Sequence, residues 1–578
     1  MLLWKNLKKF WHFGRVYETQ SVREIFWQNT KEFCRQTTLH GMKYIVDSNL
    51  KPSERCFFGV SIVTVMIAAV YLIVHVYQKW ATTPVIVGIN PQSTAITDEP
   101  FPAVTICNLN QALNDTAREF SKNSTDFTIV QLLCKREVNQ TVVKSITNWN
   151  HVEQFIVNIS QPCKDMLVEC RFGGKYYNCS HLFYPLVTDE GLCCSFNMLH
   201  PKFMYLSHIP LSYPNTTPMQ TPIDWHSEAG YPQDLPKNYY PRKIPGVGES
   251  MGLSVAIDVQ EDKYYCSSSN SIGFKFALHS PNETPNVHDT GVFIEPGKET
   301  NIRIRPDKTE SDKQLLGMSR RLRKCLFQDE GNLKFFAHYT QRNCEMECVA
   351  QVSWKYCGCI SFYMPKIYNN VTVCSINEAK CARAVRLGIY NSRTSCFDEC
   401  LPSCFEMDYP IDAFATKLAH TGLIFSNRNI AAFKRSYVVK NIAIVHMFFS
   451  SNTFRSNLQT EFIHFSDFLS SVGGLMGLFL GFSFLSIAEC IYYAVIHPCR
   501  TMGQYQRSLE LHRSLQSVRK LSSRSKKKRS TLKSRCKKLF SSSSKVHDRH
   551  VKVIKVPYAI TYGFEVPVND KVQLPFCQ

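Results

Sequence analysis

The stretch GGLMGLFLGFSFLS, residues 473–486, is apolar and uncharged, yet it carries four glycines and two serines. Glycine inside a helix costs about 0.5–1 kcal/mol relative to alanine, so a helix that accepts it repeatedly needs a reason. Gly473, Gly477 and Gly481 are spaced by four residues and would share one helix face. In a membrane, a face of small residues lets helices approach closely. The stretch therefore predicts a membrane-spanning helix that packs through its glycines.

Two segments of the chain are long and apolar enough to cross a bilayer. Residues 57–78 contain no Asp, Glu, Lys or Arg, and the same holds for residues 468–488. About 20 residues of helix match the roughly 30 Å thickness of a hydrocarbon core. Two buried helices of a soluble protein are the alternative, which this length disfavours. Residues 1–55 are mixed and charged, so we expect the first span to be an uncleaved anchor.

The distribution of charged residues predicts how the chain is oriented in the membrane. Residues 1–55 contain 10 Lys or Arg and 5 Asp or Glu, and residues 500–578 contain 19 and 4. The chain between these tails is balanced, with 38 of each sign, so the formal net charge of +20 lies in the tails. Basic segments flanking membrane spans stay on the cytoplasmic side. Both termini are therefore expected to be cytoplasmic, with residues 79–466 outside the cell and the spans in the plasma membrane.

Cysteines and glycosylation signals support the same topology. Eighteen of the 24 cysteines lie between Cys107 and Cys404, an even number suited to disulfides in an oxidising compartment. All eight Asn-x-Ser/Thr sequons lie in the same part of the chain and are candidate glycosylation sites: Asn114, Asn123, Asn139, Asn158, Asn178, Asn215, Asn282 and Asn370. The segment between the spans is therefore expected to be an extracellular glycoprotein domain.

The predicted fold is a membrane α+β architecture, with two transmembrane helices flanking a large disulfide-rich extracellular domain. Within that domain, residues 101–108 read as a strand, and residues 252–259 and 301–306 alternate like half-buried strands. From Cys325 onward the pattern becomes helical. The predicted parts are a cytoplasmic segment (1–55), a first span (56–78), the extracellular domain (79–466), a second span (467–497) and a basic, largely disordered cytoplasmic tail (498–578).

Two motifs in the sequence match a metal site or an enzyme only weakly. Three residues separate Cys344 from Cys348, and one separates Cys357 from Cys359, whereas zinc sites usually place two residues between paired cysteines. Disulfides are therefore favoured over a metal. GESMG (248–252) matches the nucleophile elbow of serine hydrolases, but a strand rather than a helix is expected after it. We accordingly predict no enzyme activity, no catalytic residue, no metal and no cofactor.

The basic tail segment KLSSRSKKKRSTLKSRCKKLF, residues 520–540, has three possible roles. In a soluble protein it could bind nucleic acid, but behind a membrane span it is better suited to anionic lipids of the inner leaflet. A solvated, disordered tail is the other alternative, and both stay open. Phosphorylation of the interleaved serines would weaken a lipid contact. We predict no nucleic-acid partner.

The second span carries more polar groups than helix packing needs. Ser470, Ser471, Ser483 and Ser486 add hydroxyl groups. Polar groups at membrane depth are costly unless they face a bundle interior or water, and glycine and serine permit a locally non-helical backbone that can line a pore. One such helix cannot enclose a pore, so several chains would have to combine. An oligomeric cation channel is favoured over a packed two-span receptor, which remains the alternative.

Motifs in the order of one family extend over residues 38–490. They are His40-Gly41 in TTLHGMKYI, FPAVTICN (101–108), GLCCSFN (191–197), CGCISFYMP (357–365), CFDECLPSC (396–404) and GLFLGFSFLSIAE (477–489). The chain thus resembles the epithelial sodium channel/degenerin family, which includes acid-sensing channels, and is most similar to its insect pickpocket branch. The resemblance implies a trimeric, sodium-preferring channel that amiloride-type cations block, with finger, thumb and palm elements and a sensory role.

The resemblance also implies roles for individual residues. Gly481, Phe482 and Ser483 match the selectivity tripeptide where the second span breaks, and Ser470 matches the gating position where bulky residues hold family channels open. The other implied site residues are Gly477 with the neighbouring Gly473 and Gly474 for amiloride and the pore, Ser471 and Asp467 for the outer pore, His40 and Gly41 for cytoplasmic gating, and Glu489 at the inner pore end. The permeant ion would be sodium.

The resemblance further implies seven disulfides. They are Cys107–Cys193, Cys170–Cys179, Cys325–Cys404, Cys344–Cys400, Cys348–Cys396, Cys357–Cys381 and Cys359–Cys374. It leaves Cys134, Cys163, Cys194 and Cys266 unassigned.

Two departures from the family pattern bear on conduction. Phe482 stands where many relatives have a small residue, so its ring is expected to pack against a neighbouring helix rather than face the pore. Ser471 stands where many relatives have an acid, and Asp467, one turn earlier, could concentrate cations instead. The sequence names no stimulus and does not distinguish a homotrimer from a heterotrimer with related subunits. The remaining alternatives are a non-conducting two-span Cys-rich receptor and an auxiliary subunit of a heteromeric channel.

Overall fold

The computed structural model describes residues 19–120, 125–134, 148–206, 220–368, 370–387, 400–419, 431, 433–501 and scattered positions up to 515. The chain divides into two compact units. The small unit comprises residues 1–67 and 476–578, and the large unit comprises residues 68–475.

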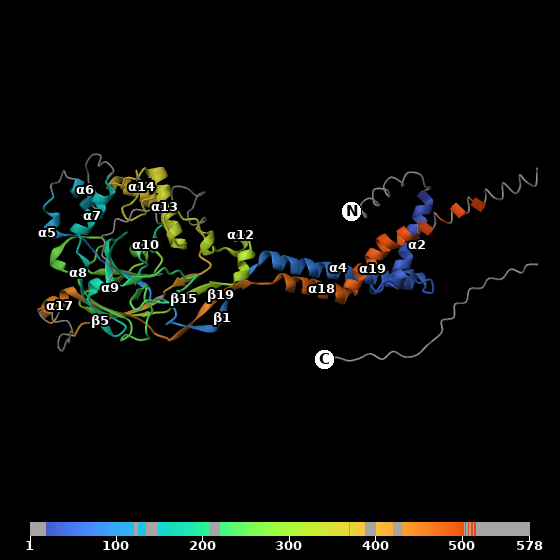
Figure 1. Ribbon diagram of the computed structural model, residues 1–578, viewed down its shortest axis with the longest axis horizontal. Coiled ribbons are helices and arrows are strands. Elements are labelled where there is room, and N and C mark those ends of the chain that lie inside the picture. The colour runs from blue at the N-terminus through green and yellow to red at the C-terminus, as the bar shows by residue number, and fades with distance from the viewer. Residues whose placement is uncertain are drawn as a thin grey trace, which may run out of the picture. The chain divides into compact units, whose positions relative to one another are not determined.

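Three antiparallel or mixed sheets form the body of the large unit (Figure 1). The first, in spatial order, is β1 (Val85–Ala95), β19 (Thr453–Glu461), β15 (Asp307–Ser311) and β16 (Glu406–Asp408). The second is β17 (Ile411–Lys417), β14 (Lys298–Ile304), β18 (Ile442–Phe449), β10 (Leu253–Asp258), β4 (Leu167–Phe172) and β5 (Lys175–Tyr177). The third is β13 (Val292–Ile294), β12 (Phe274–His279), β2 (Ala103–Asn108), β7 (Gly191–Phe196) and β6 (Phe183–Thr188). Distant parts of the chain therefore meet in every sheet.

The predicted strands at 101–108, 252–259 and 301–306 are present as β2, β10 and part of β14. The expected half-buried alternation is wrong for β10, because all its residues are buried. This strand lies between β18 and β4, and both of its faces are covered. Strand β14 does alternate towards its end, where Ile302 and Ile304 are buried and Arg303 is exposed. Neighbours in the sheet, rather than the strand's own pattern, decide how many faces are buried.

An aromatic cluster fixes the centre of this core. The Phe101 ring lies 5.5 Å from those of Phe172 and Phe449, and Phe172 lies 5.2 Å from Phe196, measured between centroids. These four rings come from different strands or loops and are 4 % exposed or less. Burial of each contributes about 1.5–3 kcal/mol.

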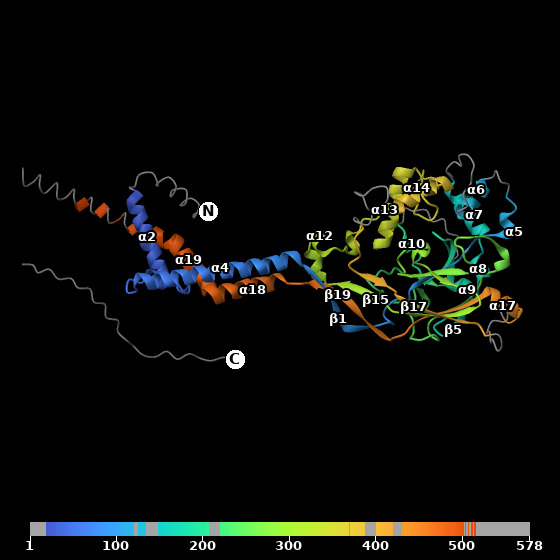
Figure 2. The same cartoon turned by 180° about the vertical axis from the view of Figure 1, so that it is seen from behind.

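Helices gather at one side of the sheets (Figures 1 and 2). They are α6 (Thr125–Leu133), α7 (Trp149–Ile159), α13 (Gln341–Cys357) and α14 (Ile376–Arg386). Thr340 starts α13 by accepting a hydrogen bond from the Asn343 N–H, and Gly358 ends it in a left-handed conformation. The helical pattern predicted from Cys325 onward begins later in the chain, because the short α12 (Arg320–Arg323) ends before Cys325 and the next α-helix is α13.

Short elements complete the large unit. They are α5 (Asn114–Ala117), α8 (Cys163–Met166), α9 (Cys179–Leu182), α10 (Pro201–Met204), α11 (Val287–Thr290), α17 (Arg435–Asn441), β3 (Asn110–Leu113), β8 (Thr221–Pro222), β9 (Tyr239–Tyr240) and β11 (Tyr264–Ser267), with 3₁₀ turns η1 (Glu261–Lys263), η2 (Lys313–Gly317) and η3 (Gln328–Glu330). The GESMG sequence (248–252) forms a turn that leads directly into β10, so no helix follows it.

Disulfides join the helices to one another and to the sheets. The structure contains Cys107–Cys193, Cys170–Cys179, Cys325–Cys404, Cys344–Cys400, Cys357–Cys381 and Cys359–Cys374, which are pairs that the resemblance implies. It also pairs the four cysteines that the sequence left unassigned, as Cys134–Cys266 and Cys163–Cys194. Cys396, the implied partner of Cys348, lies outside the described residues.

The sequons differ in accessibility. Asn158, Asn178 and Asn370 are exposed, and Asn114 is half-buried. Asn282 is only 2 % exposed, and its Oδ1 atom accepts a hydrogen bond from the Ser280 hydroxyl at 2.8 Å. Glycosylation of Asn282 stays a prediction, and the burial of this residue in the folded domain speaks against it. Asn123, Asn139 and Asn215 lie outside the described residues.

Helices form both apolar segments and the residues that flank them. They are α2 (Thr19–Gln36), α3 (Met42–Val46), α4 (Pro52–Thr82), α18 (Phe465–Leu480), α19 (Phe484–Ile491) and η4 (Tyr492–Ile496), a π-helical turn. By length and composition, α4 alone could cross a membrane. The second candidate is a broken helix, because α18 and the helical segment Phe484–Thr501 are bent by 69°. The described residues therefore contain one such helix, or two if the bent pair is one span.

Candidate functional site: the broken second span

The second apolar helix breaks at Gly481. Helix α18 ends at Leu480, and Gly481 has a φ of +66°, in the left-handed region. Its N–H group donates to the Gly477 carbonyl at 2.9 Å, which closes the last turn in the way typical of a glycine C-cap. The glycine face predicted from Gly473 to Gly481 therefore stops at Gly477. This prediction is corrected because Gly481 ends the helix instead of continuing it.

A segment from before the first span packs against this break. The His40 N–H group donates to the Leu480 carbonyl at 3.0 Å. A Cβ atom added at Gly481 would lie 2.6 Å from His40 Cδ2 and 2.7 Å from His40 Nε2. Glycine is thus required at 481 by its backbone conformation and by the imidazole beside it.

Gly41 is needed for similar reasons. Its φ is +80°, and a Cβ atom there would approach Ile62 Cδ1 on α4 to 3.0 Å. It precedes the first residue of the short helix α3. The His-Gly pair therefore turns the chain at the point where it contacts both α4 and the break in the second span.

Ser483 begins the helix on the far side of the break. Its hydroxyl accepts a hydrogen bond from the Ser486 N–H at 3.3 Å, and its own N–H donates to the Ser486 hydroxyl at 3.1 Å. This reciprocal arrangement caps the N-terminus of α19. The Ser483 hydroxyl therefore stabilises the helix start as well as standing at the predicted selectivity tripeptide.

Glu489 fastens the N-terminal segment to α19. Its Oε2 atom accepts hydrogen bonds from the Thr38 N–H at 3.0 Å and the Thr37 hydroxyl at 3.1 Å. The Thr38 hydroxyl also lies 3.0 Å from that of Ser486, which is fully buried. Hydrogen bonds to a carboxylate are stronger than neutral ones. Glu489 thus holds residues 37–38 in place.

Thr37 and Thr38 are not among the residues predicted for this site. The available signal was their position directly before Leu39, His40 and Gly41, with two hydroxyl groups beside a family motif. Their partner lies more than 400 positions away in the chain, so no local pattern could reveal the contact.

The N-terminal residues of the second apolar segment, up to Leu475, belong to the large unit. All five predicted there are exposed, namely Asp467, Ser470, Ser471, Gly473 and Gly474. A Cβ atom at either glycine would meet nothing within 4 Å. Nearby, the Phe468 ring stacks on Trp80 with centroids 5.1 Å apart. The start of α18 therefore contacts the end of α4 through aromatic rings and leaves its serines and glycines uncovered by the chain's described residues.

Phe482 is half-buried between the two helices of the broken span. Its N–H group donates to the Met476 carbonyl at 3.2 Å. Its carbonyl oxygen lies 3.8 Å from where a Cβ atom at Gly477 would be. The expected contact of its ring with a neighbouring helix stays a prediction.

The part of the chain that the structure describes contains no candidate metal site. No group of three or more His, Cys, Asp or Glu side chains is arranged to hold an ion there.

Comparison with known proteins identifies the kind of molecule to which this site belongs. A family model described as amiloride-sensitive sodium channel matches residues 33–493. The chain belongs to this family. The match begins before the His40-Gly41 pair and ends beyond Glu489, so it includes every residue that meets at the break.

Individual channel proteins are also similar to this chain over most of its length. Pickpocket protein 28 of Drosophila melanogaster is 36 % identical over 492 residues, which is 83 % of this chain and 80 % of that protein. Sodium channel protein Nach of Drosophila melanogaster is 24 % identical over 80 % of this chain and 86 % of its own length. The human bile acid-sensitive ion channel is 23 % identical over 80 % and 85 %. The family consists of multimeric ion channels, not enzymes.

Proposed function

We propose that the chain is a pore-forming subunit of a sodium-preferring, amiloride-sensitive cation channel in the plasma membrane. The observation that carries the proposal is the break at Gly481–Ser483, held by His40 on one side and capped by Ser483 on the other. A helix break at membrane depth leaves carbonyl groups without helical partners. Such backbone is tolerated where it lines a water-filled path, and carbonyl oxygens there can replace the water around an ion.

Three copies of the chain would enclose the path. Gly481, Phe482 and Ser483 would form its narrowest ring, with Gly473, Gly474 and Gly477 above them where amiloride binds. The uncovered Gly473 and Gly474 support this arrangement, because exposed small residues on an apolar helix suit close contact with a second copy or a related subunit. Asp467 and Ser471 would attract cations at the outer end, and both termini would be cytoplasmic.

Ser470 would control the opening of the pore. Residues 37–41, which we call the N-terminal clasp, would hold the inner half of the second span. Ser470 is exposed on α18, one turn before Gly474. In a trimer its small side chain would fit the closed contact, and a larger one would prop the helices apart. Residues 37–41, including His40 and Gly41, would move with α19 because Glu489 is bonded to them. A stimulus received by the large unit would act on Ser470 first.

The test is whole-cell current in cells that express Ser470→Val, with Ser466→Val, also exposed on α18, as the matched control. We expect a standing inward current in Ser470→Val alone. It should vanish when N-methyl-D-glucamine replaces sodium, and amiloride should block it. A surface-expressed Ser470→Val variant without current would contradict a self-sufficient channel.

A non-conducting receptor and an auxiliary subunit of a heteromeric channel are the competing functions. The exposed Gly473 and Gly474 favour the auxiliary subunit over the receptor, because small residues suit close contact with the helix of another subunit. Co-expression with a related subunit distinguishes them. Current that appears only in the pair identifies an auxiliary or obligate partner. A sensory role and lipid contact by the basic tail remain part of the proposal, and the tail segment 520–540 lies outside the described residues.

A further inference from the structure

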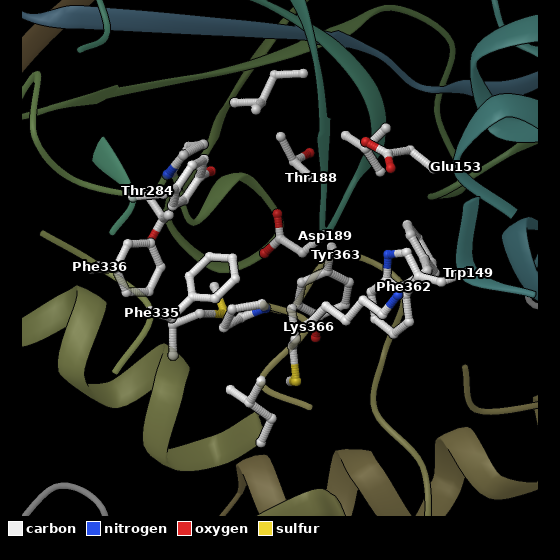
Figure 3. Close-up of a pocket in the computed structure, with 18 of the residues that line it drawn as sticks. Trp149, Glu153, Thr188, Asp189, Thr284, Phe335, Phe336, Phe362, Tyr363 and Lys366 are labelled. Carbon is white, nitrogen blue, oxygen red and sulfur yellow. The ribbon is translucent and has the colours of Figure 1, made fainter. Parts of the chain in front are cut away.

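The large unit contains a cavity of about 780 Å³ whose lining includes no residue of the candidate pore (Figure 3). Its walls include residues of α7, β6 and α13 and two loops, residues 333–336 and 362–368. Small-molecule sites in proteins usually measure roughly 300–1,000 Å³. The cavity is therefore large enough for an organic ligand.

Aromatic rings and methionines make up much of the wall. Phe335 and Phe336 lie on one side of Asp189, and Trp149 and Phe362 on the other (Figure 3). The Phe335 centroid is 5.2 Å from that of Phe336 and 5.0 Å from that of Tyr205. The wall also contains the buried methionines Met198, Met346 and Met364. Flat rings with flexible thioethers suit an apolar ligand body.

One wall loop is held in a fixed shape. Glu347 on α13 is 3 % exposed, and its two carboxylate oxygens accept the Lys334 N–H at 2.9 Å and the Phe335 N–H at 3.1 Å. These charge-assisted bonds order the loop without a ligand. The Phe335 wall of the cavity is therefore preformed.

The acidic groups of the wall are already engaged. Asp189 accepts hydrogen bonds from the Val287 and His288 N–H groups, both at 3.2 Å, and Arg386 Nη2 lies 3.6 Å from its Oδ2 atom. Burial also raises the pKa of Asp189 despite the nearby arginine. Glu153 likewise has a partner. An organic cation, which an aromatic box with a free carboxylate would attract, finds no free carboxylate here.

The two lysines in the wall are different. Lys334 is exposed and Lys366 is half-buried. Neither side chain has an ion-pair or hydrogen-bond partner within the described ranges of the chain. Tyr368, two residues beyond Lys366, is 48 % exposed, so this part of the wall reaches solvent. The cavity thus combines apolar walls with two lysines that have no side-chain partner among the described residues.

We propose that this cavity binds an amphipathic carboxylate. The apolar body of the ligand lies among the aromatic and methionine side chains, and its acid group pairs with Lys334 and Lys366. The site concerns binding to the large unit and is independent of whether the chain conducts. Because the wall is shared by α7, β6 and α13, an occupied cavity ties the helices to the third sheet.

The test is a titration of the full chain in lipid nanodiscs with 6-(dansylamino)hexanoic acid, using empty nanodiscs as the blank. Energy transfer from tryptophan to the dansyl group reports binding. The primary amide of the same probe lacks the charge. The variants are Lys334→Gln/Lys366→Gln, a control pair Lys313→Gln/Lys355→Gln at exposed positions outside the cavity, and Ile367→Trp, which fills it.

We expect saturable binding of the acid that weakens at least tenfold in Lys334→Gln/Lys366→Gln and stays unchanged in the control pair. The amide should bind the parent and the lysine variant equally. Ile367→Trp should abolish binding of both probes, and if it fails to fold, the lysine comparison decides. Absence of saturable binding to the parent, equal acid affinity in both lysine pairs, or binding that survives in folded Ile367→Trp would overturn the proposal.

Discussion

The imidazole of His40 occupies the space that any side chain at position 481 would need, with 2.6 Å between His40 Cδ2 and a Cβ atom built on Gly481. The two residues are far apart in sequence, yet the His40 N–H group also bonds to Leu480, the residue before the glycine. The N-terminal segment and the break in the second span therefore depend on each other's shape.

Substitution of Gly481 should test this dependence. Gly481→Ala places a methyl group against His40 and forces a positive φ, which costs about 1–2 kcal/mol for a residue other than glycine. We expect Gly481→Ala to lose most of the sodium current of a Ser470→Val background at equal surface expression. His40→Ala should recover part of it by removing the clash. A loss that is the same with and without His40 would show that the contact is irrelevant.

The carboxylate of Glu489 should be needed to hold the N-terminal clasp. Glu489→Gln removes the negative charge that strengthens its hydrogen bonds to Thr37 and Thr38. We expect a cysteine placed at Leu39 to react several-fold faster with a thiol reagent applied from the cytoplasm in Glu489→Gln. Thr38→Ala should give a smaller increase. Cys34→Ser in all variants removes a nearby competing thiol.

The disulfide between Cys134 and Cys266 should stabilise the large unit. It joins the end of α6 to β11 across 132 residues. Loss of a disulfide that closes a long loop typically costs about 2–4 kcal/mol. Cys134→Ser should lower the midpoint of thermal unfolding, and Cys134→Ser/Cys266→Ser should lower it by a similar amount. A much larger effect of the double variant would mean that the two cysteines act separately.

Stability of the large unit should fall with rising pH because of Glu406. Burial, together with the carboxylates of Asp408 and Asp307, raises its pKa from 4.5 to about 7. The folded state therefore binds more protons than the unfolded state between these values. The contribution of Glu406 to the stability of the folded state is therefore greatest below pH 4.5 and is lost as the pH rises to about 7.

Glu406→Gln should remove this dependence. At pH 8 we expect the variant to unfold at a higher temperature than the parent, because the cost of ionising a buried acid, up to about 3 kcal/mol, is gone. At pH 4 the two should be nearly equal. Glu295→Gln, at an exposed position, is the control. A parent and variant with parallel pH profiles would contradict the prediction.

Glycans should be absent from Asn282 and present at exposed sequons. Asn158→Gln and Asn370→Gln should each increase gel mobility by the mass of one glycan, because both side chains reach solvent. Asn282→Gln should cause no shift, because this side chain is 2 % exposed. A shift for Asn282→Gln would mean that the glycan is added before this region folds.

Much of the fold could be predicted because its signals are local. Uncharged runs of about 20 residues predicted the spans, a β-branched run predicted β2, and an alternating pattern predicted β10. The burial of β10 on both faces could not be predicted, because it depends on β18 and β4, which come from distant parts of the chain. The pairing of Cys134 with Cys266 was inaccessible for the same reason.

The sequence by itself determined where the chain is apolar, where its charges and cysteines lie, and which residues match the family motifs, because composition and order are properties of the chain alone. Only the tertiary structure decided that Gly481 ends a helix against His40, that Glu489 bonds to Thr37 and Thr38, and that Asn282 is buried. These facts rest on contacts between residues far apart in the chain, and such contacts exist only once the backbone has folded.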